Sequence, residues 1–460
     1  MKNMIQTKKA VLALGAVLGL GGCGSLDVTD LNGVSLDEFV QNPTESRVLT
    51  AATGLQIGHR VGVAIQNGYV AELGVIGREA YIFDGAEPRT VEELLGPTLD
   101  PGGPAFGGNF WAAPYANIRN ANTLLAAVDK VTGVTDGEKE AIRGYAKTIE
   151  ALDFLVIINT RDTNGAPIAV NVPLGELAPI ESKEAVFNHI ATLLDEGAAH
   201  LAAAEDFPFR FSSGFNGFNT PANFLKFNRG VKARVAVYQG RYADALTALS
   251  QSFIDASVAA DEGSKAAALS SLNVGVYHTF DAASGDLDNS LLSANIFAHP
   301  SIVTDAETAN GRIDDRVTRK TRKLEEAADA ADGKLSSDLR FTQYATADAP
   351  VPIIRNEELI LLRAEANIGL DNLDAALPDL NYIRTRSGRL PELTPAQLPN
   401  KTAAQDELLK QKRYSLLFEG GHRWIDLRRY GRLDTLPREL DPSYAPHERF
   451  PIPATEANNR

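Results

Sequence analysis

The amino-acid sequence predicts a mainly α-helical protein that contains tetratricopeptide-like helix–turn–helix repeats. Its hydrophobic content of 44% and charged content of 23% are typical of a folded globular chain. Alanine and leucine dominate, and both residues favour helices. Two stretches of helical periodicity, residues 232–249 and 363–380, also align with each other. Composition and repetition together therefore indicate a helical fold with internal repeats.

The N-terminus has the pattern of a signal peptide rather than that of a folded body. Three lysines precede the apolar residues 10–20, a stretch too short to span a bilayer. It is followed by "GGC", and the whole resembles the bacterial lipobox, in which small residues admit the signal peptidase and the cysteine receives a diacylglycerol. We therefore predict a lipoprotein signal peptide at 1–22, lipidation of Cys23 and a lipidated linker at 23–36. The alternative is a secreted protein in which a cysteine follows the cleavage site by chance.

Charge and cysteine content exclude two classes of protein. The formal charge is −14, and removal of residues 1–22 takes three of the 45 basic residues and none of the 59 acidic ones, which leaves −17. This charge provides no basic surface for a phosphate backbone, so nucleic-acid binding is not expected. Cys23 is the only cysteine, so an intramolecular disulfide is excluded. Core packing must therefore stabilise the fold, and acyl chains are expected to anchor it to the membrane.

Helical segments are expected on either side of a long irregular loop. A helix cap at 35–38 opens a mostly helical region at 37–80. Residues 81–110 are rich in glycine and proline, with aromatic residues towards both ends, and a loop of this length is usually functional. Helices are predicted next at 111–129 and 138–160, and the second of these is expected to be buried.

The two aligned stretches match at a shift of 131 residues. Ala233 pairs with Ala364 and Ala245 with Ala376, and such small residues let antiparallel helices approach closely. Two unrelated amphipathic helix pairs in an alanine-rich chain are the alternative. Between the stretches, residues 255–350 carry polar and charged runs, which predict surface loops with short elements.

Sequence motifs of enzymes are not found. The chain has no HExxH zinc motif, no paired cysteines, no GxSxG nucleophile elbow and no GxxxxGK[ST] phosphate loop. We therefore predict no catalytic residues, no metal site, no cofactor and no enzymatic activity.

The segment "FEGGHRWIDLRRYGRL", residues 418–433, gathers acids, bases and a tryptophan. Such a cluster suits either an acid–base centre or the buried joint of a helical protein. Its two consecutive glycines permit the chain to end one helix and turn. The next helix would point Trp424 inward, and Asp426 would pair with Arg423 or Arg429 at helical spacing. We interpret the segment as structural.

Several stretches resemble RagB/SusD-type lipoproteins, the nutrient-binding outer-membrane proteins of Bacteroidota and their relatives. The most specific is "PVPIIRNEELILLRAEANIGLDNLDAALPDLNYIRTRSG" (350–388), and "LLKQKRYSLLFEGGHRWIDLRRYG" (408–431) matches the family signature almost completely. "FPIPATE" (450–456) is similar to the closing segment of the family, although the usual terminal Asn-Pro is missing. The residues at signature positions are Arg355, Glu358, Glu365, Glu419, His422, Arg423, Trp424 and Asp426.

The resemblance implies a mainly α, SusD-like fold with four tetratricopeptide-like units and irregular ligand-binding loops. It implies a single domain at 37–460, with an N-terminal part at 37–350 and a C-terminal signature part at 351–460. Members of the family are lipid-anchored at the outer membrane, where they cover a SusC-like TonB-dependent barrel transporter. They capture oligosaccharides, or peptides in some branches, and pass them to the transporter. They are not enzymes.

Candidate ligand-binding residues come from 69–111, because the resemblance places the binding surface in this loop region. Aromatic faces stack on the apolar faces of sugar rings, and Arg, Asp and Asn side chains hydrogen-bond hydroxyl groups. The candidates are Tyr69, Tyr81, Phe83, Asp84, Arg89, Phe106, Asn109 and Phe110. The alternative for each aromatic residue is packing, which we expect for Trp111. A second aromatic cluster, residues 207–218, either lines a loop near the ligand or packs between helices.

Three functions are compatible with these observations. We expect a surface lipoprotein that binds oligosaccharides or other nutrients and delivers them to the transporter. The first alternative is a tetratricopeptide-type scaffold of the cell envelope that binds proteins but no small ligand. The second is a lipid-anchored hydrolase of the same polymers, which would require two carboxylates facing one cleft.

Overall fold

Residues 36–460 are described by the computed structural model, apart from 104, 173–175, 260–263 and 282–285. The predicted signal peptide at 1–22, the lipidation site Cys23 and all but the last residue of the predicted linker lie outside the described residues. The described chain is mainly helical, which confirms the predicted fold class. Within it, no helix combines the length and the apolar character required to cross a membrane.

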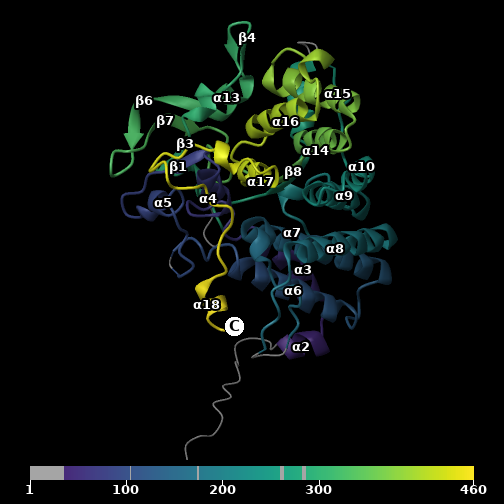
Figure 1. Cartoon of the computed structure of the whole chain (residues 1–460). Coiled ribbons are helices and arrows are strands. Elements are labelled where there is room, and N and C mark those ends of the chain that lie inside the picture. Colours follow the sequence, from purple (N-terminus) through teal and green to yellow (C-terminus); the bar gives the residue numbers. More distant parts are fainter. Residues whose placement is uncertain (1–35, 104, 173–175, 260–263, 282–285) are drawn as a thin grey trace, which may run out of the picture.

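The N-terminal part is a stack of helices. It comprises α2 (Leu36–Gln41), α3 (Glu45–His59), α6 (Ala112–Val128), α7 (Asp136–Arg161) and α8 (Lys183–Ala203) (Figure 1). The capping box of Thr135 and Glu138 starts α7, whose last 17 residues are mostly buried, as the sequence predicts. Helices α7 and α8 approach closely, since a Cβ on Gly144 would lie 2.8 Å from the carbonyl oxygen of Gly197. Glycine at both positions therefore allows backbone contact between the two helices.

Two helix–turn–helix pairs follow the predicted repeats. The first is α9 (Pro221–Tyr238) with α10 (Tyr242–Ser250), and the second is α14 (Asn356–Gly369) with α15 (Leu373–Ile383). The paired alanines Ala233, Ala364, Ala245 and Ala376 all have 0% exposure. Helix α14 packs on both α9 and α10, so the two pairs lie against each other. The four aligned alanines are therefore buried within the packed helix pairs, as the repeat pattern predicts.

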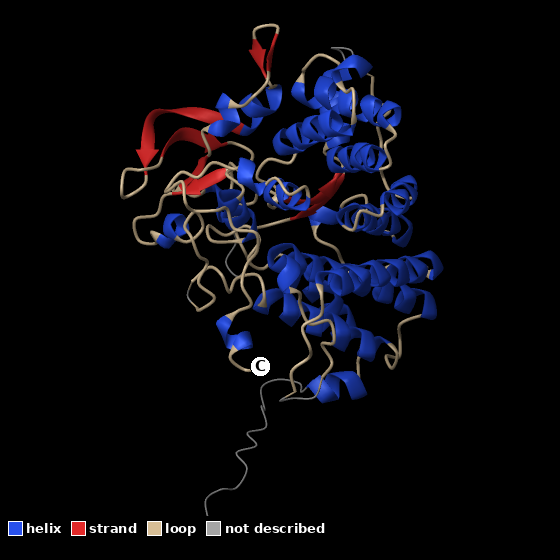
Figure 2. Ribbon diagram, viewed as in Figure 1, coloured by secondary structure: helices blue, strands red, loops and turns tan. Residues whose placement is uncertain are grey.

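Short strands and loops cover the other side of the molecule (Figure 2). Of the four antiparallel strand pairs in the described residues, three lie there: β1 (Ala80–Ile82) with β3 (Ile296–Ala298), β4 (Thr308–Ala309) with β5 (Arg312–Ile313), and β6 (Thr321–Asp329) with β7 (Ser336–Phe341). The fourth pair, β2 (Gly275–His278) with β8 (Val351–Arg355), lies among the helices, where β8 packs against α9 and α14. Four short helices lie among the first three pairs: α4 (Tyr69–Ile76), α5 (Arg89–Glu92), α12 (Ser301–Thr304) and α13 (Asp315–Lys320), and α11 (Lys265–Leu272) packs near α14. The predicted loops at 255–350 thus contain most of the strands.

The predicted structural joint lies between α16 (Lys401–Ser415) and α17 (His422–Arg429), and α18 (Ala454–Ala457) follows near the C-terminus. Gly420 and Gly421 have φ angles of 124° and 78°, which favour glycine. A Cβ on Gly421 would lie 2.5 Å from the Cβ of Leu73 on α4, so any side chain at this position would clash with α4. The turn places the ring of Trp424 in the core with 0% exposure.

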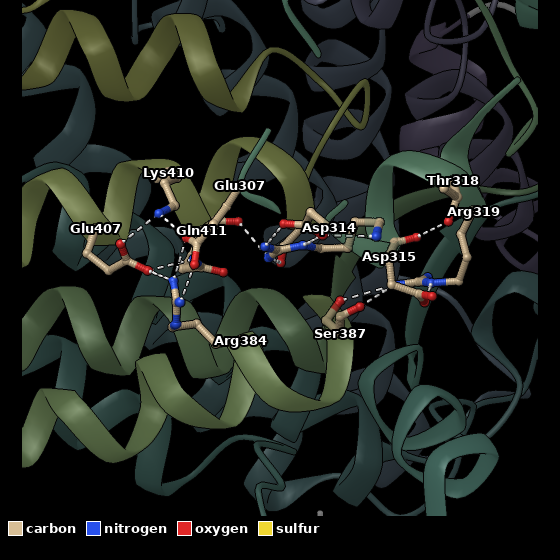
Figure 3. Close-up of polar contacts among 12 residues, drawn as sticks. Glu307, Asp314, Asp315, Thr318, Arg319, Arg384, Ser387, Glu407, Lys410 and Gln411 are labelled. Carbon is tan, nitrogen blue, oxygen red and sulfur yellow. Dashed lines mark hydrogen bonds and ion pairs between the residues drawn. The ribbon is translucent and has the colours of Figure 1, made fainter. Parts of the chain in front are cut away.

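A network of charged side chains joins the irregular side to the C-terminal helices (Figure 3). Arg384, at the end of α15, donates 2.7 Å and 3.0 Å hydrogen bonds to the two carboxylate oxygens of Glu307. The same guanidinium contacts Glu407 on α16, and Lys410 of that helix also reaches Glu307. The hydrogen bond from Arg384 is the largest cause that lowers the pKa of Glu307, to about 2. The loop before β4 is therefore held to α15 and α16 by ionised groups.

Candidate functional site

A cavity of about 140 Å³ lies where the loop after α3 meets the start of α6. Three of the eight predicted ligand residues, Tyr69, Asn109 and Phe110, line it. The structure thus brings together candidates that are 40 residues apart in the chain. Each of the three side chains is partly exposed, so a ligand in the cavity would reach them.

Phe110 adopts an unusual backbone conformation in this cavity. Its φ of 60° lies in the left-handed region, which costs a bulky residue roughly 1–3 kcal/mol. The preceding residue is held on both sides: the Asn109 carbonyl accepts a 2.6 Å hydrogen bond from Arg161, and its side chain donates one of 2.7 Å to Glu72. The Phe110 ring then meets the ring of Tyr69 edge to face, with centroids 5.4 Å apart and an angle of 89°. The cavity therefore has a fixed aromatic corner.

The other predicted ligand residues lie outside this cavity lining. Tyr81 and Phe83 stack at 5.2 Å on the β1–β3 side, and the Tyr81 hydroxyl donates to Glu439. The guanidinium of Arg89 lies 5.8 Å from the centroid of the Phe106 ring. Tyr81 and Phe106 are each only 3% exposed. Their burial reflects packing in the core beneath β1, and a ligand role for these two rings stays a prediction.

Asp84 serves as a connection between loops. Its carboxylate accepts a 2.6 Å hydrogen bond from Gln66, whose own carbonyl oxygen accepts from Ser293 and Asn295. These contacts tie the loop after α3 to the loop before β3. Asp84 therefore positions the loop that carries part of the cavity, and direct contact with a ligand stays a prediction for it, as for Phe83 and Arg89.

A second cavity, of about 360 Å³, adjoins the first. His59 lines both, so this one side chain forms part of the wall between them. The second lining also includes Arg60, Arg210 and Ser212, together with Tyr277 and other residues of the segment around β2. Sequence analysis did not find this cavity, because its walls come from α3, the 210–215 loop and the 277–281 segment, which only the fold brings together.

His59 is fixed in place by a buried hydrogen-bond network. Its Nδ1 lies 2.7 Å from the carboxylate of Asp153 on α7, and Asn117 on α6 donates a 2.7 Å hydrogen bond to the other Asp153 oxygen. Burial raises the pKa of Asp153 against the opposing effect of His59. The sequence does give one sign of this network, because Asp153 is an acidic residue within an apolar run of α7. The network joins three helices beneath both cavities.

A third, smaller cavity of about 70 Å³ is also lined by His59. His278 and His422 line it with Tyr69 and Arg234. Burial lowers the pKa of His422, and it lowers the pKa of His278 well below its usual value. In the described residues, no group of three or more His, Cys, Asp or Glu side chains is arranged to hold a metal ion.

The apolar ridge, as we name the exposed side chains of Ile57, Val61 and Ile65, borders the two larger cavities. Ile57 lines the larger cavity and is 46% exposed. Val61 and Ile65 line the smaller one and are 47% and 44% exposed. Three large aliphatic side chains this exposed at one place are a feature of binding surfaces.

The residues of the C-terminal signature are buried, except Glu419 and Arg423, which are partly exposed, and they contact several helices. Glu419 accepts hydrogen bonds from Arg355, at 2.9 Å, and from Lys320, at 2.7 Å. Arg234 on α9 forms a two-pronged ion pair with Glu358 on α14 at 2.6 Å and 2.7 Å. The contacts of Glu419 connect the turn before α17 to β8 and α13, and the Arg234–Glu358 pair connects α9 to α14, which agrees with a structural role.

A second buried group surrounds Glu365. Its carboxylate lies 2.8 Å from Lys412 and 2.6 Å from Arg429, and both cations also pair with Asp426. Burial opposes ionisation of Glu365, but Arg429 and Lys412 outweigh it and lower its pKa to about 2. Of the two predicted partners of Asp426, Arg429 makes the contact, while Arg423 donates to the carbonyl of Arg78 instead.

The remaining aromatic candidates mostly pack. Trp111 is 8% exposed, under the guanidinium of Arg161 at 5.4 Å, as expected for a packing residue. In the 207–218 cluster, Phe209, Phe215 and Phe218 are buried. The cluster gathers around the ring of Tyr145, with which Phe209 makes a contact of 4.8 Å. Phe211 and Phe215 also line the larger cavity, so the cluster packs and borders the site.

Comparisons with known proteins agree with this architecture. Residues 332–458 match the model of the SusD family. A SusD-like carbohydrate binding protein from Bacteroides fragilis is 16% identical, with a TM-score of 0.67 over 92% of this chain and 99% of that one. Another SusD-like protein from Bacteroides fragilis is 14% identical, with a TM-score of 0.68 over 91% of this chain and 96% of its own.

A laminarin binding SusD-like protein is 17% identical, with a TM-score of 0.63 over 90% of this chain and 98% of its own. A comparison with curated protein sequences finds no match. The structural matches show the fold, and the family model covers the segment that contains the buried signature residues. Residues 332–458 therefore match the model of the SusD family, and the chain has a fold similar to that of solved SusD-like proteins over about nine-tenths of its length.

Proposed function

We propose that this chain is a surface-exposed lipoprotein that binds oligosaccharides or other nutrients and delivers them to a SusC-like TonB-dependent outer-membrane transporter. The observation that carries the proposal is the pair of adjoining cavities around His59, which are bordered by the exposed apolar side chains of Ile57, Val61 and Ile65. Loops from the irregular side and helix ends from the stacked side meet there. Similar structures described as carbohydrate binding and laminarin binding support a sugar as one class of ligand.

The proposed function is ligand binding, and we expect the bound ligand to remain chemically unchanged. A purified full-length chain in detergent is incubated with panels of oligosaccharides and of peptides, and bound material is released and weighed by mass spectrometry. We expect at least one panel to be retained with its mass unchanged. Products of cleavage would instead support the hydrolase, and retention of neither panel would refute the proposed function.

The membrane anchor is proposed at Cys23, after removal of residues 1–22. The lipobox resemblance supports it, and each acyl CH₂ that enters the bilayer contributes about 0.8 kcal/mol. Two or three acyl chains would thus hold the protein firmly at the outer membrane. The partner proposed there is the barrel transporter, and the charge of −17 favours docking onto basic extracellular loops.

The scaffold alternative rests on the two packed helix pairs, α9–α10 and α14–α15. A protein that captures envelope proteins but no glycan or peptide would favour this alternative.

We also propose that residues 37–460 form one domain. Two hydrogen bonds between its N-terminal and C-terminal parts support this: Arg428 donates to the Asn159 carbonyl at 2.7 Å, and the Phe450 amide donates to the Thr160 carbonyl at 2.8 Å.

A further inference from the structure

The chemistry of the two cavities distinguishes between classes of ligand. The smaller cavity is mostly apolar, with walls made by Val61, Val63, Ile65, Ala113, Pro114 and Val156 beside the aromatic corner. Tyr69 and Phe110 meet at 89°, so they form a corner and not a flat platform. Both tryptophans, Trp111 and Trp424, are buried, at 8% and 0% exposure. Sugar rings stack on flat aromatic faces, whereas this corner suits an aliphatic or aromatic side chain.

The amide oxygen of Asn67 in the same wall has no partner within the described residues. The Oδ1 atom of Asn67 is buried and accepts no hydrogen bond within the described part of the chain. A buried acceptor without a partner costs roughly 1–3 kcal/mol, so a ligand N–H at this place would be stabilised. A side-chain amide offers one acceptor and two donors, which is the complement of a peptide group.

The larger cavity is lined by two arginines, Arg60 and Arg210, and by two aspartates, Asp281 and Asp286. The Arg210 side chain is exposed, and no ion pair is made by it among the residues that the structure describes. Arg60 contacts Asp286 and the Thr279 carbonyl, but its Nε is buried without a partner. Guanidinium groups bind carboxylates with two parallel hydrogen bonds. Arg210, which is exposed and unpaired within the described residues, is therefore the group of this lining that suits a ligand carboxylate.

We propose that the ligand is a short peptide with a free C-terminal carboxylate, which lies across the ridge of Ile57, Val61 and Ile65. An apolar side chain occupies the Tyr69–Phe110 cavity, and the carboxylate faces Arg210 and Arg60. The end of helix α3, about 10 Å wide, lies between the two cavities, and three or four extended residues span about that distance. This inference rests on the proposed function and specifies the ligand of the same site.

The first test compares two ligand pools on the full-length chain in detergent. One pool contains peptides from a tryptic digest of casein, and the other contains malto-, xylo- and laminari-oligosaccharides. We expect retained peptides, identified by mass spectrometry, to be enriched in Leu, Ile, Val and Phe three or four residues before the C-terminus. Retention of oligosaccharides alone would overturn this inference and leave the proposed function standing, whereas retention of neither pool would refute both.

The second test uses calorimetry with the most enriched peptide. Conversion of its carboxylate to an amide, or of its apolar residue to serine, should each weaken binding. Val61→Asp places a charge at the apolar rim and should weaken binding by at least about tenfold, because a buried apolar side chain contributes about 1.5–3 kcal/mol. Leu370→Asp is the matched control, since Leu370 is similarly exposed, at 41%, at the end of α14.

Arg210→Gln tests the carboxylate end separately. It should weaken binding of the free acid about two- to fivefold, as expected for a partly exposed ion pair, and leave binding of the amide unchanged. Thermal unfolding of each variant confirms that it is folded. Equal affinity for acid and amide in the unmodified chain, or full affinity in Val61→Asp, would overturn the proposal.

Discussion

Truncation of Trp424 is the sharpest test of the structural interpretation of the C-terminal signature. The indole is fully buried, and its Nε1 donates a 2.7 Å hydrogen bond to the carbonyl of His447. The Arg428 guanidinium lies 4.3 Å from the ring centroid on one side, and the Phe450 ring lies 6.0 Å away. Trp424→Ala would therefore remove a large apolar surface and leave a cavity at the contact between α17 and α4.

The magnitude follows from the buried area. A buried tryptophan removes about 150–250 Å² from water, and at about 25 cal/mol per Å² this corresponds to about 4–6 kcal/mol. Alanine retains part of that area, so we expect a loss of about 3–5 kcal/mol in the free energy of unfolding, in line with other truncations of buried aromatics. Trp424→Phe should lose less, because most of the ring remains and the hydrogen bond contributes about 1 kcal/mol.

Urea unfolding followed by circular dichroism measures these losses. Leu370→Ala, at an exposed position, is the control and should change the free energy of unfolding by less than about 0.5 kcal/mol. Ligand binding by Trp424→Ala should persist at temperatures where the variant is folded. A loss below about 1 kcal/mol, or unchanged stability with abolished binding, would refute the structural reasoning and favour a direct functional role.

Four further predictions concern ionised groups and the anchor. Glu365→Gln should cost about 3–5 kcal/mol at pH 7, because Lys412 and Arg429 lose a buried counter-ion. The pKa of Glu365 is lowered to about 2, so its stabilisation is present above about pH 4.5 and is lost towards pH 2 in urea titrations. Burial raises the pKa of Glu79 to about 7, so folding loses about 3 kcal/mol as pH rises from 4.5 through 7, and Glu79→Gln should abolish that loss. Cys23→Ser should move the chain from the detergent phase to the aqueous phase in a phase-separation assay. Co-purification with the barrel transporter should fall as NaCl rises from 50 to 500 mM, because salt screens charges at the interface.

Specific results would contradict each of these predictions. Equal stability of Glu365→Gln and the unmodified chain at pH 7 would show that the buried ion pairs contribute little. If stability still falls between pH 4.5 and 7 in Glu79→Gln, groups other than Glu79 cause the pH dependence. Unchanged phase partition of Cys23→Ser would exclude the lipid anchor, and an equal transporter yield at both salt concentrations would exclude docking through charge.

The helical architecture was accessible from the sequence because its signals are local. Aligned alanines predicted the helix–turn–helix pairs α9–α10 and α14–α15, and two glycines predicted the turn before α17. The strands within 255–350 were not predicted. Two pairs, β4 with β5 and β6 with β7, join neighbours in sequence, whereas the short strands β2 and β3 pair with the distant strands β8 and β1. The pairing partner, and not the local pattern, decides where such strands form.

Part of the candidate site was predictable for the same reason. The aromatic residues of the loop before α6 led to the prediction of Asn109 and Phe110 as ligand residues. The sequence of this loop does not show which of its rings are exposed and which are packed. Tyr81, in β1, and Phe106, beside Arg89, belong to the same predicted region, but both are only 3% exposed. The wall formed by His59 and Asp153 joins residues 94 positions apart, and only the fold brings them to 2.7 Å.

The most direct measurement of the central claim is the location and state of a bound ligand. Crystals of the full-length chain, grown with the retained peptide or oligosaccharide, would show it in contact with Tyr69, Phe110 and Val61. The account predicts an intact ligand in the cavities on either side of His59. A ligand bound among the helices α14 to α16, or recovered as cleavage products, would contradict it.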